Sequence, residues 1–242
     1  MFIVLTRRLV PALTVSLMFG LCFVLPAKSQ DNATPGTLSG TVAATSDYVF
    51  RGYSQTQNDP ALQAGVTWSL PSGIYAGVWG SNVEFTAGDK ADLEVDLTAG
   101  YAGKADALSY DLGVIYYAYP DARSGSNYGY WEGALKLAYD FGPAVWSGGF
   151  YYTPDNFGGT KDGAYLTTGI RVPFAEKWAV DANLGRAEVN PAYGADYFDW
   201  NVGLSYAFPW FDASLRYTDT DNDANCARLC DARGVFTISK SF

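Results

Sequence analysis

Few residues in this 242-residue chain have the types and spacing that chemistry requires, and no His is among them. Without imidazole the sequence lacks the usual general base, the usual nitrogen ligand for metals and any Ser/His/Asp arrangement. Glu94 and Asp96 share one face of an expected strand, a spacing that hydrolysis by two acids could use. We interpret both as channel lining instead, and we predict a protein with no enzymatic activity and no cofactor.

A late acidic segment has part of the pattern of a calcium-binding loop. Asp219, Asp221 and Asp223 have the alternate spacing of its first ligands. However, Ala224 stands where such a loop requires Gly, and Cys230 stands where it requires the closing Glu. We therefore expect a solvated acidic loop with no metal ion.

The same segment carries Cys226 and Cys230, which are the only cysteines of the chain after export. In an oxidising envelope, two cysteines in C-x3-C spacing favour a small disulfide that closes the loop. Free thiols remain the alternative, because spacing alone does not exclude them. A metal site made of two thiols without His is a weaker interpretation.

The first 29 residues have the three parts of a secretory signal. Arg7 and Arg8 form the positive part, residues 9–26 the apolar part, and Ala27-Lys28-Ser29 a small-x-small cleavage site. The predicted division of the chain is a signal peptide at 1–29, a short periplasmic segment at 30–36 and a single domain at 37–242.

Export changes the charge balance, because it removes Arg7, Arg8 and Lys28 and no acidic residue. The mature chain has 13 basic residues against 25 acidic ones, a net charge of −12. Such a chain repels nucleic-acid phosphates, so we expect no nucleic-acid partner. No later segment has the roughly 18 to 20 apolar residues that a spanning helix needs. A mature chain that enters a membrane must therefore form a closed barrel.

Residues 37–242 fall into segments of about ten residues with one apolar face and one polar or small face, as transmembrane barrel strands do. The clearest apolar row is Phe198, Trp200, Val202, Leu204 and Tyr206. The positions between them hold Asp, Asn, Gly and Ser. A secreted soluble β-sandwich or barrel would show the same alternation. The polar composition of the second face over many segments favours the membrane barrel.

Connections between these segments alternate between short and long, which an up-and-down barrel requires. The five short ones, rich in turn-forming residues, are 71–73, 103–106, 141–143, 173–175 and 208–209. The six long ones are 50–59, 86–91, 120–128, 154–161, 189–195 and 219–231. Eleven connections join twelve strands, an even number that leaves both chain ends in the periplasm and the long loops outside. We predict an all-β fold, a transmembrane antiparallel up-and-down β-barrel of about twelve strands.

Aromatic residues gather near the expected strand ends, where the interfacial girdles of a membrane barrel would lie. They are Trp68, Tyr130, Trp131, Tyr151, Tyr152, Trp178, Tyr197, Phe198 and Trp210.

The chain closes on an alternating strand at 234–242. Phe236, Ile238 and Phe242 share one face, and Lys240 breaks this apolar row. A terminal aromatic on such a strand resembles the signal that the outer-membrane barrel assembly machinery recognises. We therefore expect this machinery and outer-membrane lipid as partners, and the bacterial outer membrane as the location.

Two adjoining motifs near the start of the domain carry a resemblance to a known family. The first is Ser46-Asp47-Tyr48-Val49-Phe50-Arg51-Gly52-Tyr53-Ser54-Gln55-Thr56, and the second is Asp59-Pro60-Ala61-Leu62-Gln63-Ala64-Gly65-Val66. Together with Tyr110-Asp111-Leu112-Gly113, Tyr116-Tyr117 and the closing strand, they resemble the TorF family of putative porins, a proteobacterial group of conserved hypothetical proteins. The resemblance covers nearly all of the mature chain. It implies an outer-membrane barrel and passive transport, but no substrate and no binding residue.

We expect the first motif to form the top of the first strand and its outer loop. Tyr48, Phe50 and Tyr53 would then anchor at the membrane interface. Arg51 would either point toward the mouth of the barrel or hold the loop through carboxylates or backbone carbonyls.

The strand register predicts which charged residues face the interior. The seven acids are Glu94, Asp96, Asp111, Glu132, Asp181, Asp199 and Asp212, and the three basic residues are Lys136, Arg171 and Arg216. Twelve strands about 4.8 Å apart and tilted about 40° form a cylinder on the order of 24 Å across, with a lumen on the order of 10 Å. The acid excess predicts a mild preference for cations. Alternatively, these charges pair across neighbouring strands and brace the wall.

We therefore expect a porin-like channel for the passive diffusion of small hydrophilic solutes. The alternative is a plugged barrel of similar build, which would have a structural role or would serve adhesion or recognition without transport.

Overall fold

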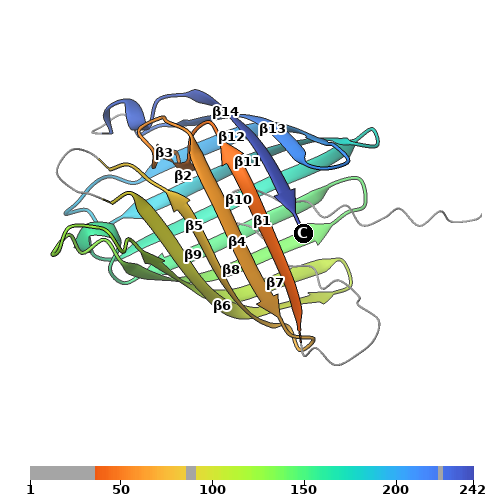
Figure 1. Ribbon diagram of the computed structural model, residues 1–242, viewed down its shortest axis with the longest axis horizontal. Helices are drawn as coiled ribbons and strands as arrows, with labels where there is room; N and C mark the ends of the chain where they lie inside the picture. The colour runs from red at the N-terminus through yellow and green to blue at the C-terminus, as the bar shows by residue number, and fades with distance from the viewer. Residues whose placement is uncertain (1–35, 86–90, 223–225) are drawn as a thin grey trace, which may run out of the picture.

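The computed structural model describes residues 36–85, 91–222 and 226–242. The predicted signal peptide at 1–29 lies outside the described residues, as does the predicted periplasmic segment at 30–36 except for Gly36. Twelve strands form one closed antiparallel barrel, in which β1 pairs with both β4 and β14 (Figure 1). The predicted antiparallel barrel of twelve strands is confirmed.

The barrel strands are β1 (Thr37–Thr45), β4 (Ala61–Ser69), β5 (Ile74–Asn82), β6 (Leu93–Ala105), β7 (Leu108–Ala118), β8 (Tyr130–Asp140), β9 (Val145–Thr153), β10 (Gly163–Phe174), β11 (Trp178–Val189), β12 (Tyr197–Ala207), β13 (Asp212–Thr220) and β14 (Arg233–Ser241). Outside the barrel are a short hairpin of β2 (Val49–Phe50) and β3 (Tyr53–Ser54), and the 3-10 turns η1 (Phe157–Gly159) and η2 (Ala227–Leu229). Among the described residues, no helix is long and apolar enough to cross a membrane.

The alternation of residue types along each strand decides which face is buried. On β12, Phe198, Val202 and Leu204 point outward with exposed fractions of 40%, 50% and 42%. Asp199 and Gly203, at the intervening positions, are buried on the inner face. Successive side chains of a strand point to opposite faces, so the apolar row covers the outside and the polar row lines the inside.

The barrel has two unlike ends, because short and long connections alternate as predicted. At the turn end, strands are joined by two to four residues, and positive φ angles at Gly73 (97°), Asp106 (53°) and Gly142 (91°) allow the tight reversals. The loop end holds the longer connections and the β2–β3 hairpin, at the left of Figure 1, while the C-terminus lies at the turn end.

The first long connection differs from the prediction. Strand β1 ends at Thr45, and residues 46–60 form a separate segment, the mouth hairpin, around β2 and β3. Arg51 and Gly52 have φ angles of 48° and 85°, which suit the two central positions of a tight hairpin turn. The expectation that Tyr48 anchors at a membrane interface was wrong, because its side chain is 3% exposed and faces the interior.

The predicted aromatic girdle needs a similar correction. Tyr130, Tyr151 and Tyr197 lie on the inner face, because each shares its strand parity with inward-facing polar residues. The other predicted members are exposed, with fractions of 40% or more; they are Trp68, Trp131, Tyr152, Trp178, Phe198 and Trp210.

Candidate functional site

The mouth hairpin crosses the loop end of the barrel from one wall to the other. It starts and ends at β1 and β4, and β8 to β10 face these strands across the closed sheet. At its tip, Arg51 binds Glu132 on β8. A Cβ at the adjacent Gly52 would lie 3.1 Å from the Cβ atoms of Asp199 on β12 and Thr220 on β13. The hairpin therefore narrows the interior at this end.

The tip of the mouth hairpin is held by charge and by aromatic rings. One guanidinium nitrogen of Arg51 donates to both Glu132 oxygens, at 2.9 and 2.8 Å, and Tyr117 Oη donates to the same carboxylate at 3.0 Å. The guanidinium carbon lies 4.3 Å from the ring centroid of Tyr165 and 5.2 Å from that of Tyr151. Burial lowers the pKa of Arg51, but the Glu132 carboxylate outweighs it, and the net shift is upward. Arg51 is therefore charged.

The base of the mouth hairpin is organised by Asp47, which is 3% exposed. Its carboxylate accepts hydrogen bonds from Ser54 Oγ at 2.6 Å, from Thr56 Oγ1 at 3.1 Å and from Arg233 on β14 at 2.8 Å. Two of these donors come from the returning arm of the hairpin, so the carboxylate ties both arms to the wall.

Tyr48 fixes the same base to a second part of the wall. Its hydroxyl donates to Glu94 on β6 at 2.9 Å. Burial, reinforced by the Glu94 carboxylate, raises the pKa of Tyr48 well above its usual value, so the hydroxyl keeps its proton and acts as donor.

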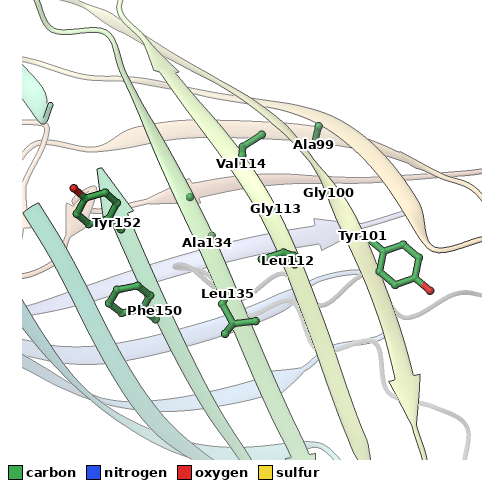
Figure 2. Close-up of a pocket in the computed structure, with 11 residues that line it drawn as sticks. Ala99, Gly100, Tyr101, Leu112, Gly113, Val114, Ala134, Leu135, Phe150 and Tyr152 are labelled. Atoms are coloured by element: carbon green, nitrogen blue, oxygen red, sulfur yellow. The ribbon is translucent and has the colours of Figure 1, made fainter. Parts of the chain in front are cut away.

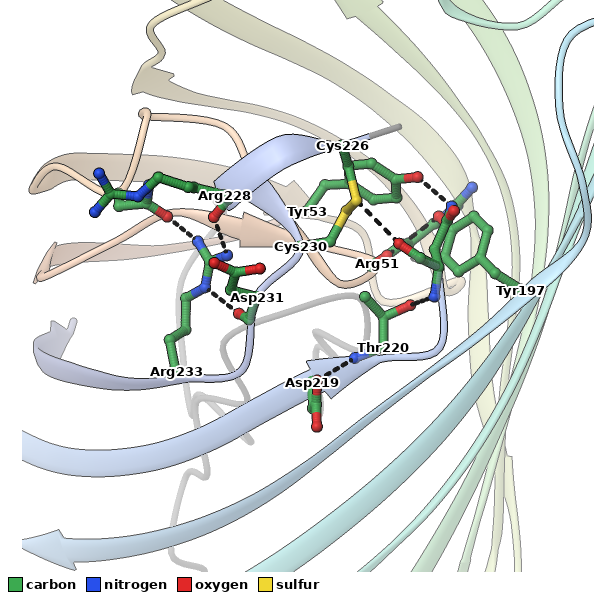
Figure 3. Close-up of a disulfide and its surroundings, with 12 residues drawn as sticks. Arg51, Tyr53, Tyr197, Asp219, Thr220, Cys226, Arg228, Cys230, Asp231 and Arg233 are labelled. Carbon is green, nitrogen blue, oxygen red and sulfur yellow. Dashed lines mark hydrogen bonds between the residues drawn. A yellow bond between two sulfur atoms is a disulfide. The ribbon is translucent and has the colours of Figure 1, made fainter. Parts of the chain in front are cut away.

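The connection between β13 and β14 packs on the mouth hairpin, as Figure 3 shows. Cys226 and Cys230 are joined in a disulfide with their Cα atoms 5.7 Å apart. From this connection Asn222 donates to Tyr53 Oη. Arg233, at the start of β14, donates to the Arg228 carbonyl at 2.9 Å. The mouth hairpin is thus held by the connection between β13 and β14 as well as by the barrel wall.

All ten charged residues that were predicted to face the interior lie on the inner face of the sheet. They are Glu94, Asp96, Asp111, Glu132, Lys136, Arg171, Asp181, Asp199, Asp212 and Arg216.

Several of these charges pair between strands that are adjacent or one strand apart. Asp111 binds Lys136 Nζ at 2.9 Å and accepts a hydrogen bond from Tyr75 Oη at 2.8 Å. Asp181 lies between two guanidinium groups, 3.5 Å from Arg171 and 2.7 Å from Arg216. These pairs brace the wall, as the alternative interpretation of the charges expected.

The remaining interior acids have other surroundings. Asp199 accepts hydrogen bonds from Tyr165 Oη at 2.9 and 3.2 Å. Asp96 follows Glu94 on the same inner face of β6. Asp212 is half-buried at the turn end of β13. Among the described residues, none of the four acids Glu94, Asp96, Asp199 and Asp212 is in an ion pair.

Inward-facing tyrosines are the interior residues that the sequence interpretation missed. The buried ones on the barrel strands are Tyr75, Tyr117, Tyr130, Tyr151 and Tyr165. A signal was present, because Tyr130 shares its parity with Glu132, and Tyr165 shares its parity with Arg171. Tyr130 and Tyr151 were assigned to the outer girdle instead.

The late acidic segment does not converge on a common point. Asp219 accepts hydrogen bonds from Tyr217 Oη and the Thr220 amide, whereas Asp221 accepts one from the Phe198 amide. Asp223 lies outside the described residues. Within the described part of the chain, no group of three or more His, Cys, Asp or Glu could hold a metal ion.

An open groove of about 570 Å³ lies on the outer face of β6 to β9 (Figure 2). Its larger side chains are Tyr101, Leu112, Leu135, Phe150 and Tyr152, which all point outward. Small residues between them, such as Ala99 and Gly133, leave the hollow. The groove belongs to the apolar outer wall and is separate from the polar interior.

A comparison with protein families identifies the chain. The model of a family described as "Bacterial protein of unknown function (Gcw_chp)" matches residues 29–242. The chain belongs to this family. Family membership supplies no activity, and a comparison with curated proteins finds no match.

Solved structures show where else the fold occurs. The barrel is similar to the KdgM porin, with a TM-score of 0.55 and 13% identity over 84% of this chain and 98% of that chain. The KdgM porin in complex with disordered oligogalacturonate matches with a TM-score of 0.54 and 11% identity over the same shares. The NanC porin matches with a TM-score of 0.51 and 13% identity, again over 84% and 98%. At these identities the similarity establishes the fold.

Proposed function

We propose that the mature chain is an outer-membrane channel for the passive diffusion of small hydrophilic solutes, without enzymatic activity and without a cofactor. Outer-membrane lipid surrounds the barrel, and the barrel assembly machinery inserts it. The observation that carries this proposal is the closed barrel with an apolar outer face and a polar inner face. Such a distribution suits lipid outside and water inside.

The similarity to porins adds support, because proteins that are named porins have a similar fold over almost their whole length. The structure of one of them holds oligogalacturonate, a polyanionic sugar. We do not extend this solute class to the present chain, since its interior has seven predicted acids against three basic residues, or four with Arg51. Fixed carboxylates repel polyanions.

The same excess supports a mild preference for cations. Ion pairs neutralise Asp111, Glu132 and Asp181. Since Asp181 pairs with both Arg171 and Arg216, one positive charge is left over. The preference therefore rests on the acids outside these pairs, which are Glu94, Asp96, Asp199 and Asp212.

Flux through liposomes tests the proposal. The mature chain, residues 30–242, is refolded into liposomes, and swelling is followed in uncharged sugars of increasing size. We expect swelling with small sugars and a sharp loss of flux for larger ones, because the lumen is on the order of 10 Å before the hairpin narrows it. Liposomes with the heat-unfolded chain are the control. Barrels that are inserted but pass no sugar would contradict the proposal.

One observation favours a second candidate, a plugged barrel without transport. The mouth hairpin is bound at its tip and at its base, and the disulfide-bearing connection packs on it. The liposome experiment separates the two functions, since a plugged barrel inserts and remains impermeable.

A further inference from the structure

Glu132 is the centre of a site with the chemistry of cation recognition. Its side chain is 1% exposed, and it is bound by a guanidinium group and by the Tyr117 hydroxyl. The rings of Tyr151 and Tyr165 lie beside the same guanidinium. A carboxylate combined with aromatic faces is the arrangement that binds guanidinium and ammonium groups, through a charge-assisted hydrogen bond and the ring quadrupoles.

The wall builds this site without the hairpin. Tyr117, Glu132, Tyr151 and Tyr165 come from the consecutive strands β7, β8, β9 and β10. Tyr117 is further fixed by stacking on Tyr130, with ring centroids 4.4 Å apart and an interplanar angle of 15°. The barrel therefore holds the acidic and aromatic groups in place, whereas the cation comes from a connection on the far side of the closed sheet.

We propose that Glu132 and the surrounding tyrosines form a binding site for guanidinium and primary ammonium groups, which Arg51 fills from within and for which cationic solutes compete. The inference rests on the proposed channel function and adds a substrate class to it. A solute that takes the place of Arg51 frees the tip of the mouth hairpin and so widens the passage at the point where the solute is bound.

Competition with Arg51, which is tethered to the barrel, determines how tightly a free cation binds at Glu132. A group on a short connection has an effective concentration on the order of millimolar or higher, so a free cation competes poorly with the wild-type chain. Guanidinium is weakly hydrated and planar, so it stacks on aromatic rings better than sodium does. The site therefore favours organic cations over inorganic ones.

The experiment removes the internal ligand and supplies an external one. Ethylguanidinium chloride, which has the charged end of an arginine side chain, is titrated into the refolded mature chain in detergent and followed by ligand-observed NMR. Sodium chloride at the same concentrations corrects for ionic strength. Arg51→Ala should bind ethylguanidinium about tenfold more tightly than the wild type, because its own competitor is gone.

Two further variants locate the site. Arg51→Ala combined with Glu132→Gln should lose this gain, since the charge of the site is removed. Arg186→Ala is the control. Arg186 lies on the exposed outer side of β11 and pairs with Glu188 and with Asp196 in the connection to β12, so this variant should bind like the wild type. Arg51→Met retains the apolar stem and replaces Arg51→Ala if that variant does not fold. Heat-modifiable gel migration checks the folding of each variant.

Equal binding by the wild type, Arg51→Ala and the double variant would overturn the inference. Because binding is measured in detergent, it is independent of conduction. A barrel that binds ethylguanidinium through Glu132 but passes no solute contradicts the channel function and leaves the site standing. A conducting barrel without this binding contradicts the site alone.

Discussion

Two buried carboxylates hold the mouth hairpin at its opposite ends. Glu132, on the wall, binds the tip through Arg51. Asp47, within the hairpin, joins the two arms and binds Arg233 on β14. A buried carboxylate is stable only when its oxygens accept hydrogen bonds, and both meet this condition. The position of the hairpin thus depends on few side chains.

Replacing Asp47 by Ala should free the base of the hairpin. The change removes three hydrogen bonds to the carboxylate, and because Thr56 and Arg233 keep other partners we expect a total cost of about 1–3 kcal/mol. We expect amide protection over residues 46–60 to fall by about 10- to 100-fold, while the barrel strands retain theirs. Hydrogen exchange followed by mass spectrometry measures both.

Asp121→Ala is the matched control, because Asp121 accepts a hydrogen bond from the exposed Asp92 amide in another connection. Unchanged protection over residues 46–60 in the Asp47 variant would show that the carboxylate does not organise the hairpin.

Single residues differ in how far the sequence could place them. The inward direction of the ten predicted charges follows from a period of two, which is a local property. The partner of Arg51 is 81 residues away, and nothing in the local pattern selects Glu132. Arg51 was expected either to point toward the mouth or to hold the loop, and its contact with a carboxylate matches the second expectation.

Two inward-facing tyrosines each cross a glycine on the neighbouring strand and donate a hydrogen bond to a carboxylate on the strand beyond it. Tyr75 on β5 crosses Gly100 on β6 to reach Asp111 on β7, and its hydroxyl donates to the carboxylate at 2.8 Å. Tyr165 on β10 crosses Gly185 on β11 to reach Asp199 on β12 in the same way. In each case the glycine leaves room for the ring.

Replacing Gly100 by Ala should therefore destabilise the barrel. A Cβ at this position would lie 2.6 Å from Tyr75 Oη and 2.6 Å from the Leu112 carbonyl oxygen. We expect a loss of about 1–3 kcal/mol in the free energy of unfolding, the usual cost of overpacking. Reversible unfolding of the refolded protein in denaturant measures it.

Gly133→Ala is the comparison for this variant. A Cβ there points outward, and its nearest neighbour is the Tyr152 carbonyl oxygen at 3.9 Å. Equal stability of the two variants would mean that the contact of Tyr75 with Gly100 is not required.

The strands and turns were predictable because their signals are local. Alternation defines a strand, and residues such as Gly73 and Gly142 mark the reversals. The turn of the mouth hairpin also has a local signal, Arg51-Gly52. No local signal indicates that the hairpin folds into the barrel. The segment turns inward because Asp47, Tyr48 and Arg51 find partners on β14, β6 and β8, which are distant in sequence.

At the scale of the whole molecule, closure brings the last strand against the first. The backbone of Phe242 exchanges hydrogen bonds with Gly40, at 2.9 and 3.0 Å, while its ring is 68% exposed on the outer face. The ring covers Gly40 of β1, and its outer side stays exposed.

Phe242→Ala should accordingly reduce assembly more than stability. We expect much less folded protein in the outer membrane, but only a small decrease in the unfolding midpoint of the fraction that is purified and refolded, because the ring packs on Gly40 and its outer side stays exposed. Heat-modifiable migration of membrane fractions measures the first quantity. Phe236→Ala, on the same outer row, is the control. Equal amounts of assembled protein from the two variants would contradict a role of the terminal ring as an assembly signal.

The central claim is that the barrel conducts solutes through a passage that the mouth hairpin narrows. Single-channel recording of the refolded mature chain in a planar bilayer, under a salt gradient, tests it most directly. We predict discrete conductance steps with a reversal potential of the sign that cation preference requires, because the unpaired interior acids attract cations. Demonstrated insertion without any conductance would contradict the claim and would favour a plugged barrel.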